Sequence, residues 1–149
     1  MAWRAITEAD ILTQLSKTEL ETIRSQAESD PVPAAVSSMM EHVRGSVAAH
    51  ASNVMGAEGT IPERLMAAAV SLLVVRLYAA NAGMLIDLDK TRAEAAKSAE
   101  RLLERVSEGK FAVELPGPVG TSAEDGKSSA AELVTQSANP LRRDDLAGL

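Results

Sequence analysis

Hydrophobic residues recur at helical spacing through the first two thirds of the chain, in segments separated by capping residues, prolines and glycines. Thr7 precedes an acidic turn, and Ser16 with Glu19 forms a capping-box pattern, so a short helix is expected to begin at each site. Asp30 followed by Pro31 then predicts the start of a longer helix, because proline at the first helical position loses no hydrogen bond. The apolar positions of the two short helices are Ile11, Leu12, Leu15, Leu20, Ile23 and Ala27.

The long helix after Pro31 carries a single apolar stripe with spacings of three and four residues. We expect the helix to end within the segment 53–59, which contains two glycines able to take left-handed conformations. Thr60 and Glu63 form a second capping-box pattern, with Pro62 in its first turn. The stripe consists of Val32, Val36, Met40, Val43, Val47, His50 and Val54.

The helix predicted after Glu63 is apolar around nearly its whole circumference and should end at 81–83. Such a helix is buried on several sides, either at the centre of the domain or partly against a neighbouring subunit. Arg76 interrupts it and is expected to meet a carboxylate or exposed helix carbonyls, because an unpaired buried charge is strongly unfavourable. We therefore predict that Leu72, Val75 and Arg76 make contacts within or between subunits.

Asp87 or Asp89 can cap one further helix, which Gly109 should end. Arg92 interrupts its apolar stripe in the same way as Arg76, which makes it another candidate for a subunit interface. The stripe consists of Leu88, Ala95, Ala99, Leu102 and Val106. Pairs of opposite charge, each worth ~0.2 to 0.5 kcal/mol, are expected at Lys90–Glu94, Lys97–Glu100 and Arg101–Glu104.

The chain changes character after this helix. Residues 111–115 alternate as a short strand or extended segment would, and 116–118 break regular structure with two prolines and a glycine. The remainder has too few large apolar side chains to offset the entropy of ordering. We predict a helical domain at 1–115 and a flexible linker and docking tail at 116–149. The expected docking residues, leucines spaced among charges, are Leu141, Arg142, Arg143, Leu146 and Leu149.

Composition supports an all-α fold, a bundle of about four to five helices with a short extended segment and a flexible C-terminal tail. Of the 149 residues 46% are hydrophobic but only 2% aromatic, so small and unbranched side chains must fill the core. The net charge of −6 provides no basic field for gripping nucleic acid. The longest apolar stretch is well short of the ~20 residues that span a bilayer, so a soluble protein without membrane contact is expected.

No pattern of catalytic, cofactor-binding or metal-ligating residues emerges, and the sequence predicts a protein that is not an enzyme. The loop beginning at Gly120 has five residues between its glycines where a phosphate-binding loop has four, and two of the five are acids. His42 and His50 lie eight residues apart, about 12 Å along one helix, too far to share a metal. Asp87 and Asp89 lack the glycine and distal glutamate of a calcium loop.

Taken in order, these segments resemble the head-to-tail connector proteins of tailed phages, the adaptor or head-completion group that includes the Mu-like family. The resemblance covers nearly the whole chain. It rests on the opening Ile6–Leu12, the long helix after Pro31, the apolar helix ending in Arg76–Tyr78, the helix 92–108 with Gly109 and Val113–Leu115 after it, and the terminal Arg143–Leu149.

The resemblance implies a helical bundle assembled as a ring, expected to be a dodecamer, beneath the portal protein. Such a ring joins the portal to a neck or tail protein and helps to retain packaged DNA, which passes through the lumen without specific binding. It implies no cofactor, and it implies synthesis in the host bacterial cytoplasm followed by a place at the neck of the virion. The tail would order when it docks on the portal.

Two other classes of protein stay open from the sequence. A monomeric or dimeric cytosolic helical adaptor or regulatory protein would share the bundle and the tail but would form no ring. A small enzyme with an unrecognised helical site would need a concave pocket holding Arg76 and a carboxylate.

Overall fold

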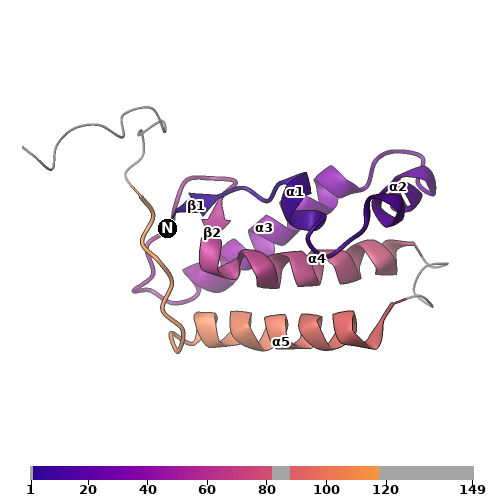
Figure 1. The fold of residues 1–149 in the computed structure, drawn as a ribbon. Helices are drawn as coiled ribbons and strands as arrows, with labels where there is room; N and C mark the ends of the chain where they lie inside the picture. The colour runs from indigo at the N-terminus through magenta and orange to yellow at the C-terminus, as the bar shows by residue number, and fades with distance from the viewer. Residues whose placement is uncertain (1, 82–87, 118–149) are drawn as a thin grey trace, which may run out of the picture. The chain divides into compact units, whose positions relative to one another are not determined.

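A computed structural model of the chain describes residues 2–81 and 88–117. These residues belong to one compact unit that ends at Gly117, two residues beyond the predicted domain boundary. The unit is mostly helical, with a small two-stranded sheet, so the predicted all-α bundle is confirmed (Figure 1). Its elements are β1 (Trp3–Arg4), α1 (Glu8–Ile11), α2 (Lys17–Ser25), α3 (Val32–Ala48), β2 (Ile61–Pro62), the 3-10 turn η1 (Glu63–Leu65), α4 (Met66–Ala80) and α5 (Lys90–Ser107).

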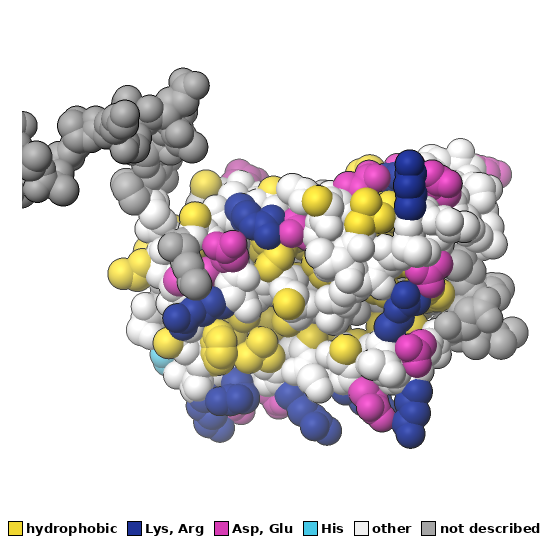
Figure 2. Space-filling view, in the orientation of Figure 1, with side chains coloured by type: hydrophobic (Ala, Val, Ile, Leu, Met, Phe, Trp, Pro, Cys, Tyr) yellow, Lys and Arg dark blue, Asp and Glu magenta, His cyan; other side chains and the backbone are white. Residues whose placement is uncertain are grey.

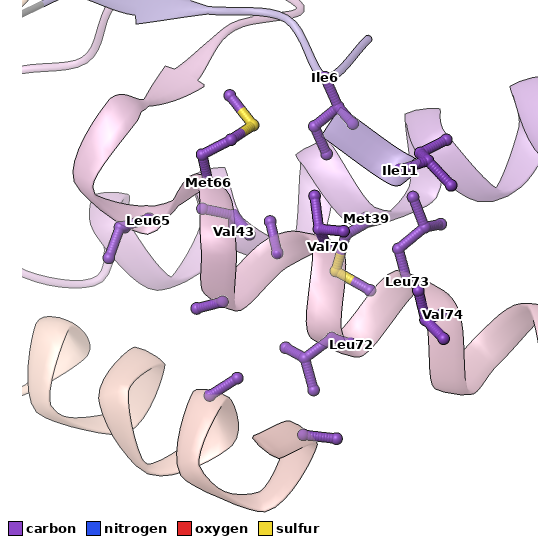
Figure 3. Packing of buried hydrophobic residues seen from close by; sticks show 14 of the residues in the cluster. Ile6, Ile11, Met39, Val43, Leu65, Met66, Val70, Leu72, Leu73 and Val74 are labelled. Atoms are coloured by element: carbon purple, nitrogen blue, oxygen red, sulfur yellow. The ribbon is translucent and has the colours of Figure 1, made fainter. Parts of the chain in front are cut away.

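Helix α4 forms the centre of the unit. It packs against α3, α5 and α1, and nine of its 15 residues are buried. In Figure 1, α5 runs along one side of α4 while α1 and α3 lie on the other. Figure 3 shows Ile11 from the N-terminal segment and Met39 from α3 near Val70 and Leu73 of α4. The apolar circumference of this helix is therefore covered largely by the chain's own elements.

Local capping signals start α1 and α2 where the sequence predicted. The carboxylate of Asp10 accepts a 2.8 Å hydrogen bond from the Thr7 amide before α1. At α2, the Ser16 amide donates to Glu19 Oε2 at 2.7 Å and the Glu19 amide donates to Ser16 Oγ at 3.2 Å, which completes the predicted capping box. Both short helices are thus held at their N-termini by side chains three residues away.

The ends of α5 also follow the sequence. Asp89 caps its N-terminus and accepts a 3.0 Å hydrogen bond from the Thr91 amide. After the last turn, Gly109 takes a φ of 72°, and its amide donates to the Val106 carbonyl at 3.0 Å. The next amide reaches back to the Arg105 carbonyl at 2.8 Å, which completes a Schellman motif. The residues that follow, 111–117, form neither a helix nor a paired strand.

Two predictions between α3 and α4 are wrong. Helix α3 ends at Ala48, before the segment 53–59, and Val54 beyond it is 52% exposed. The second capping box does not form, because Ile61 and Pro62 instead pair antiparallel with β1. The hydroxyl of Thr60 donates to a loop carbonyl at 2.6 Å rather than capping a helix. Pairing with a strand 58 residues away overrides the local helix signal, and α4 begins at Met66.

At some positions of α3 and α5, the buried residue is the neighbour in sequence of the residue that the predicted stripe contained. Met39 is fully buried where the stripe placed Met40, and Ala96 is buried where it placed Ala95. Leu103 similarly replaces Leu102, which is only partly buried. Adjacent apolar residues fit a helical stripe almost equally well, and the position of α4 decides which of each pair is covered.

Candidate interaction surface

A polar network joins α2, α4 and α5, and it contains the predicted interface residue Arg92. The carboxylate of Glu19 accepts hydrogen bonds from Arg92 Nη1 at 2.9 Å, from the Tyr78 hydroxyl at 2.8 Å and from the Ser16 amide at 2.7 Å. Arg92 Nη2 also donates to the Gln14 carbonyl at 3.0 Å. The guanidinium of Arg92 therefore serves the chain's own packing.

Electrostatics in this network favour the charged pair. The hydrogen bond from Arg92 lowers the pKa of Glu19 to about 2, against the opposing effect of burial, with further help from the Ser16 amide and the Tyr78 hydroxyl. Burial, followed by the hydrogen bond to Glu19, raises the pKa of Tyr78. Neither group titrates near neutral pH, so the network holds helices together and is poorly suited to proton transfer.

The three predicted interface residues of α4 lie in different environments. Leu72 is 7% exposed and belongs to the core, which leaves it little surface for a second subunit. Val75 is partly buried, and Arg76 is exposed. The sequence predicted a carboxylate or helix carbonyl as the partner of Arg76, but among the described residues its Nη1 donates instead to Ser38 Oγ at 3.1 Å. Its exposure to water removes the need for a charged partner.

A groove of about 640 Å³ runs between α3 and α5. Helix α3 contributes His42 and Ser46, and the side of α5 that faces α3 contributes the rest of the lining. Arg76, which the enzyme alternative required in a pocket, is absent from it. The α5 residues of this groove are Lys97, Glu100, Arg101, Leu103, Glu104 and Ser107.

Exposed charges on α5 form two lines beside this groove, and Figure 2 shows Lys and Arg side chains along the edge of the unit that α5 makes. Of the three intrahelical pairs predicted, Lys90–Glu94 is present, at 4.0 Å. Within residues 2–81 and 88–117, the other predicted partners form no ion pair within 4.0 Å. One line consists of the cations Lys97, Arg101 and Arg105, and the other consists of the acids Glu100 and Glu104, which form no ion pair with a described residue.

A clamp around Trp3, which the sequence did not predict, joins the two ends of the compact unit. The Trp3 indole donates a 2.9 Å hydrogen bond to the Glu114 carbonyl. The guanidinium of Arg44 lies 5.9 Å from the centre of the Trp3 ring and donates to the Thr60 carbonyl at 2.8 Å. Gly56 lies directly against the ring, where a Cβ atom would come within 2.5 Å of it. The clamp thus also holds the loop between α3 and β2.

Glu114 takes the capping role that the sequence assigned to Thr60. Its side chain is only 10% exposed, and Oε1 accepts a 3.0 Å hydrogen bond from the Arg64 amide in the first turn of η1. Arg64 Nε lies 3.4 Å from Oε2. A carboxylate near a helix N-terminus stabilises the helix, because the N-terminal end of the helix dipole is positive. Here the carboxylate belongs to a residue 50 positions further along the chain.

The histidines lie apart, as their spacing predicted. His42 is exposed at the α3–α5 groove, whereas His50 lies beyond the end of α3 with its ring against Gly109. Across the described part of the chain, no cluster of three or more His, Cys, Asp or Glu residues is placed to hold a metal ion. Over the same residues, no helix combines the length and apolar character that crossing a membrane requires.

The predicted docking residues lie outside the described residues; they are Leu141, Arg142, Arg143, Leu146 and Leu149. The same holds for Asp87 and for the loop that begins at Gly120. Comparison with known proteins found no matching family model, curated protein or solved structure.

Proposed function

We propose that this chain is a head-to-tail connector of a tailed phage. In this role the helical unit is one subunit of a ring, expected to be a dodecamer, below the portal protein, and the ring joins the portal to a neck or tail protein. The observation that carries the proposal is the pairing of a compact helical unit ending at Gly117 with 32 further residues that contain few large apolar side chains and end in leucines set among charges. The sequence resemblance to phage connectors gives this pairing its interpretation.

The proposed role is structural and needs no cofactor. The chain has a net charge of −6, and an acidic lumen repels the phosphate backbone, so DNA passes through the ring without being gripped. The protein is made in the cytoplasm of the bacterial host and is incorporated at the neck of the virion, where it helps to retain the packaged DNA.

The docking function is assigned to the end of the tail. Leucines supply apolar anchors and the arginines between them supply charge, and a segment that orders on contact pays its entropy only at assembly. The residues assigned to this contact with the portal are Leu141, Arg142, Arg143, Leu146 and Leu149.

Light scattering of the purified protein, alone and mixed with a candidate portal, tests the proposal. We expect a large ring, or a complex with the portal that is lost when residues 138–149 are deleted. Deletion of residues 121–132, a segment of equal length nearer the body, is the matched control and should leave portal binding intact. A monomer or dimer that ignores the portal would instead favour a cytosolic helical adaptor or regulatory protein.

A further inference from the structure

Helix α5 carries two parallel lines of opposite charge on its exposed side. Lys97, Arg101 and Arg105 follow one another at intervals of four residues, about 6 Å apart along the axis. Glu100 and Glu104 form a second line, displaced by about 60° around the helix, and these acids line the α3–α5 groove together with Lys97 and Arg101. All five side chains are exposed.

These charges are left unpaired by the fold in the part of the chain that the structure describes. The spacings Lys97–Glu100 and Arg101–Glu104 would suit intrahelical ion pairs, yet neither pair comes within 4.0 Å. By contrast, Arg4, Arg24, Arg64 and Arg92 all form ion pairs within the unit. The side of α5 away from the core therefore presents a charge pattern available to a partner.

We propose that α5 is the contact between successive subunits, with Arg101 and Arg105 of one copy lying against Glu100 and Glu104 of the next, at the α3–α5 groove. The inference rests on the ring of the proposed function and identifies the surface that builds it. It moves the candidate interface from Leu72 and Arg92, which the chain uses internally, to residues that form no ion pair within the described part of the chain.

A second copy of this chain fits the pattern better than nucleic acid does. A phosphate backbone would be attracted by the basic line but repelled by the acidic line beside it and by the net charge of −6. Another α5 in parallel orientation presents acids and bases at the same four-residue interval, so its acidic line can face the basic line of the first. The groove of about 640 Å³, which is lined by Lys97 and Arg101 as well as by Glu100 and Glu104, gives side chains of a second copy room beside both lines.

The arrangement is head-to-tail. In each contact the basic line of one copy meets the acidic line of the next, so the two sides of a contact differ. A heterologous contact of this kind closes into a ring when the rotation between subunits permits, and otherwise propagates as a filament. Because the contact is charged and exposed, salt should weaken it, since the screening length is about 8 Å at physiological ionic strength.

Charge reversal in the full chain tests this contact. Glu100→Lys with Glu104→Lys gives a variant with two basic lines, and Arg101→Glu with Arg105→Glu gives one whose first line is acidic at every position except Lys97. Multi-angle light scattering should show the wild type well above dimer mass and each variant alone at the monomer mass of 15.7 kDa. An equimolar mixture of the two variants should assemble again, because each basic line then meets an acidic one.

A matched reversal on α2, Lys17→Glu with Glu21→Lys, exchanges exposed charges at the same spacing and should assemble as the wild type does. Circular dichroism of every variant establishes that a loss of mass is not a loss of fold. Any of three results would overturn the inference. The wild-type protein could remain a monomer or dimer in low salt, the α5 variants could assemble normally, or the mixture of variants could fail to reassemble.

The test separates this inference from the proposed function. If portal binding depends on residues 138–149 but the α5 reversals do not change assembly, the α5 contact is refuted and the proposed connector function is retained. Charge-dependent assembly of a protein that does not bind a portal would refute the connector and retain the α5 contact. Nucleic acid is tested with labelled duplex DNA in an electrophoretic mobility-shift experiment. If the wild type shifts the DNA and the Arg101→Glu, Arg105→Glu variant does not, the basic line binds nucleic acid and the inference is overturned.

Discussion

Arg92 and Glu19 are 73 residues apart in the sequence, and their side chains form an ion pair of 2.9 Å that joins α5 to the first turn of α2. The same guanidinium hydrogen-bonds to the Tyr78 hydroxyl at 2.8 Å and the Gln14 carbonyl at 3.0 Å. One side chain thus connects three helices and the turn between α1 and α2. Its removal should loosen the packing of all of them together.

Replacement of Arg92 by Met should lower the free energy of unfolding by about 2 kcal/mol, because Glu19 keeps its partly buried charge and loses its cation. Urea denaturation monitored by circular dichroism measures the change. Arg76→Met on α4 is the matched control, since Arg76 is exposed and its one hydrogen bond among the described residues is to Ser38, and should change stability by less than about 0.5 kcal/mol. Equal effects of the two substitutions would contradict the assigned role of Arg92.

Stability should fall in acid through Glu19. Its pKa is about 2 in the folded chain and 4.5 without the surrounding partners, so the folded state favours the charged form. The resulting stabilisation is complete above pH 4.5 and is lost as the pH falls toward 2. The hydrogen bond from Arg4 also lowers the pKa of Asp10, which adds a loss of the same sign.

Glu19→Gln should therefore be less stable than the wild type by about 1 to 2 kcal/mol at neutral pH and nearly equal to it close to pH 2. Urea titrations at a series of pH values give both curves. Glu21→Gln, at an exposed position of the same helix, should follow the wild-type curve throughout. A constant difference between Glu19→Gln and wild type across the acid range would rule out the ion pair as the source.

Two glycine-to-alanine substitutions should have opposite effects. Gly109 has a φ of 72° and lies against the His50 ring, so Gly109→Ala should destabilise the fold by about 1 to 2 kcal/mol. Gly45 is inside α3 with open space at its Cβ position, so Gly45→Ala should stabilise the fold by about 0.5 to 1 kcal/mol. Thermal unfolding of both variants measures the signs, and a stabilising Gly109→Ala would refute the left-handed cap.

The single tryptophan reports on the clamp at the start of the chain. A Cβ atom added at Gly56 would lie 2.5 Å from the Trp3 ring, so Gly56→Ala should displace the indole from the Glu114 carbonyl. We expect a red-shifted fluorescence maximum and a loss of about 1 to 3 kcal/mol. A Cβ atom added at Gly117 meets no described residue within 4 Å, so Gly117→Ala should leave the spectrum unchanged. An unshifted Gly56→Ala spectrum would show that the ring does not lie where the clamp places it.

The features predicted correctly from the sequence depend on residues close together along the chain. Ser16 and Glu19 cap α2, Asp89 caps α5 and Gly109 ends it, because each signal acts over a few residues whatever the tertiary context. The apolar character of α4 likewise predicted burial on several sides, and the structure shows that α1, α3 and α5 provide most of the cover.

Features that depend on distant partners could not be predicted. Thr60 has the local pattern of a cap, but β1 pairs with Ile61 and the carboxylate of Glu114 supplies the capping oxygen instead. At the candidate interaction surface, the spacing of charges on α5 predicted pairs within the helix, of which Lys90–Glu94 forms. A three- or four-residue spacing permits such a pair but does not require it.

The hydrogen bond between the Trp3 indole and the Glu114 carbonyl determines how the helical unit would respond to mechanical load. A pull on the chain beyond Gly117 reaches Glu114 before it reaches α5, and there the force divides between β1 through Trp3 and, through Arg64, the turn η1 that leads directly into α4. These contacts would have to break before α5 could be peeled from the bundle from its C-terminal end. A tether attached after Gly117 would therefore pull on the central helix of the unit.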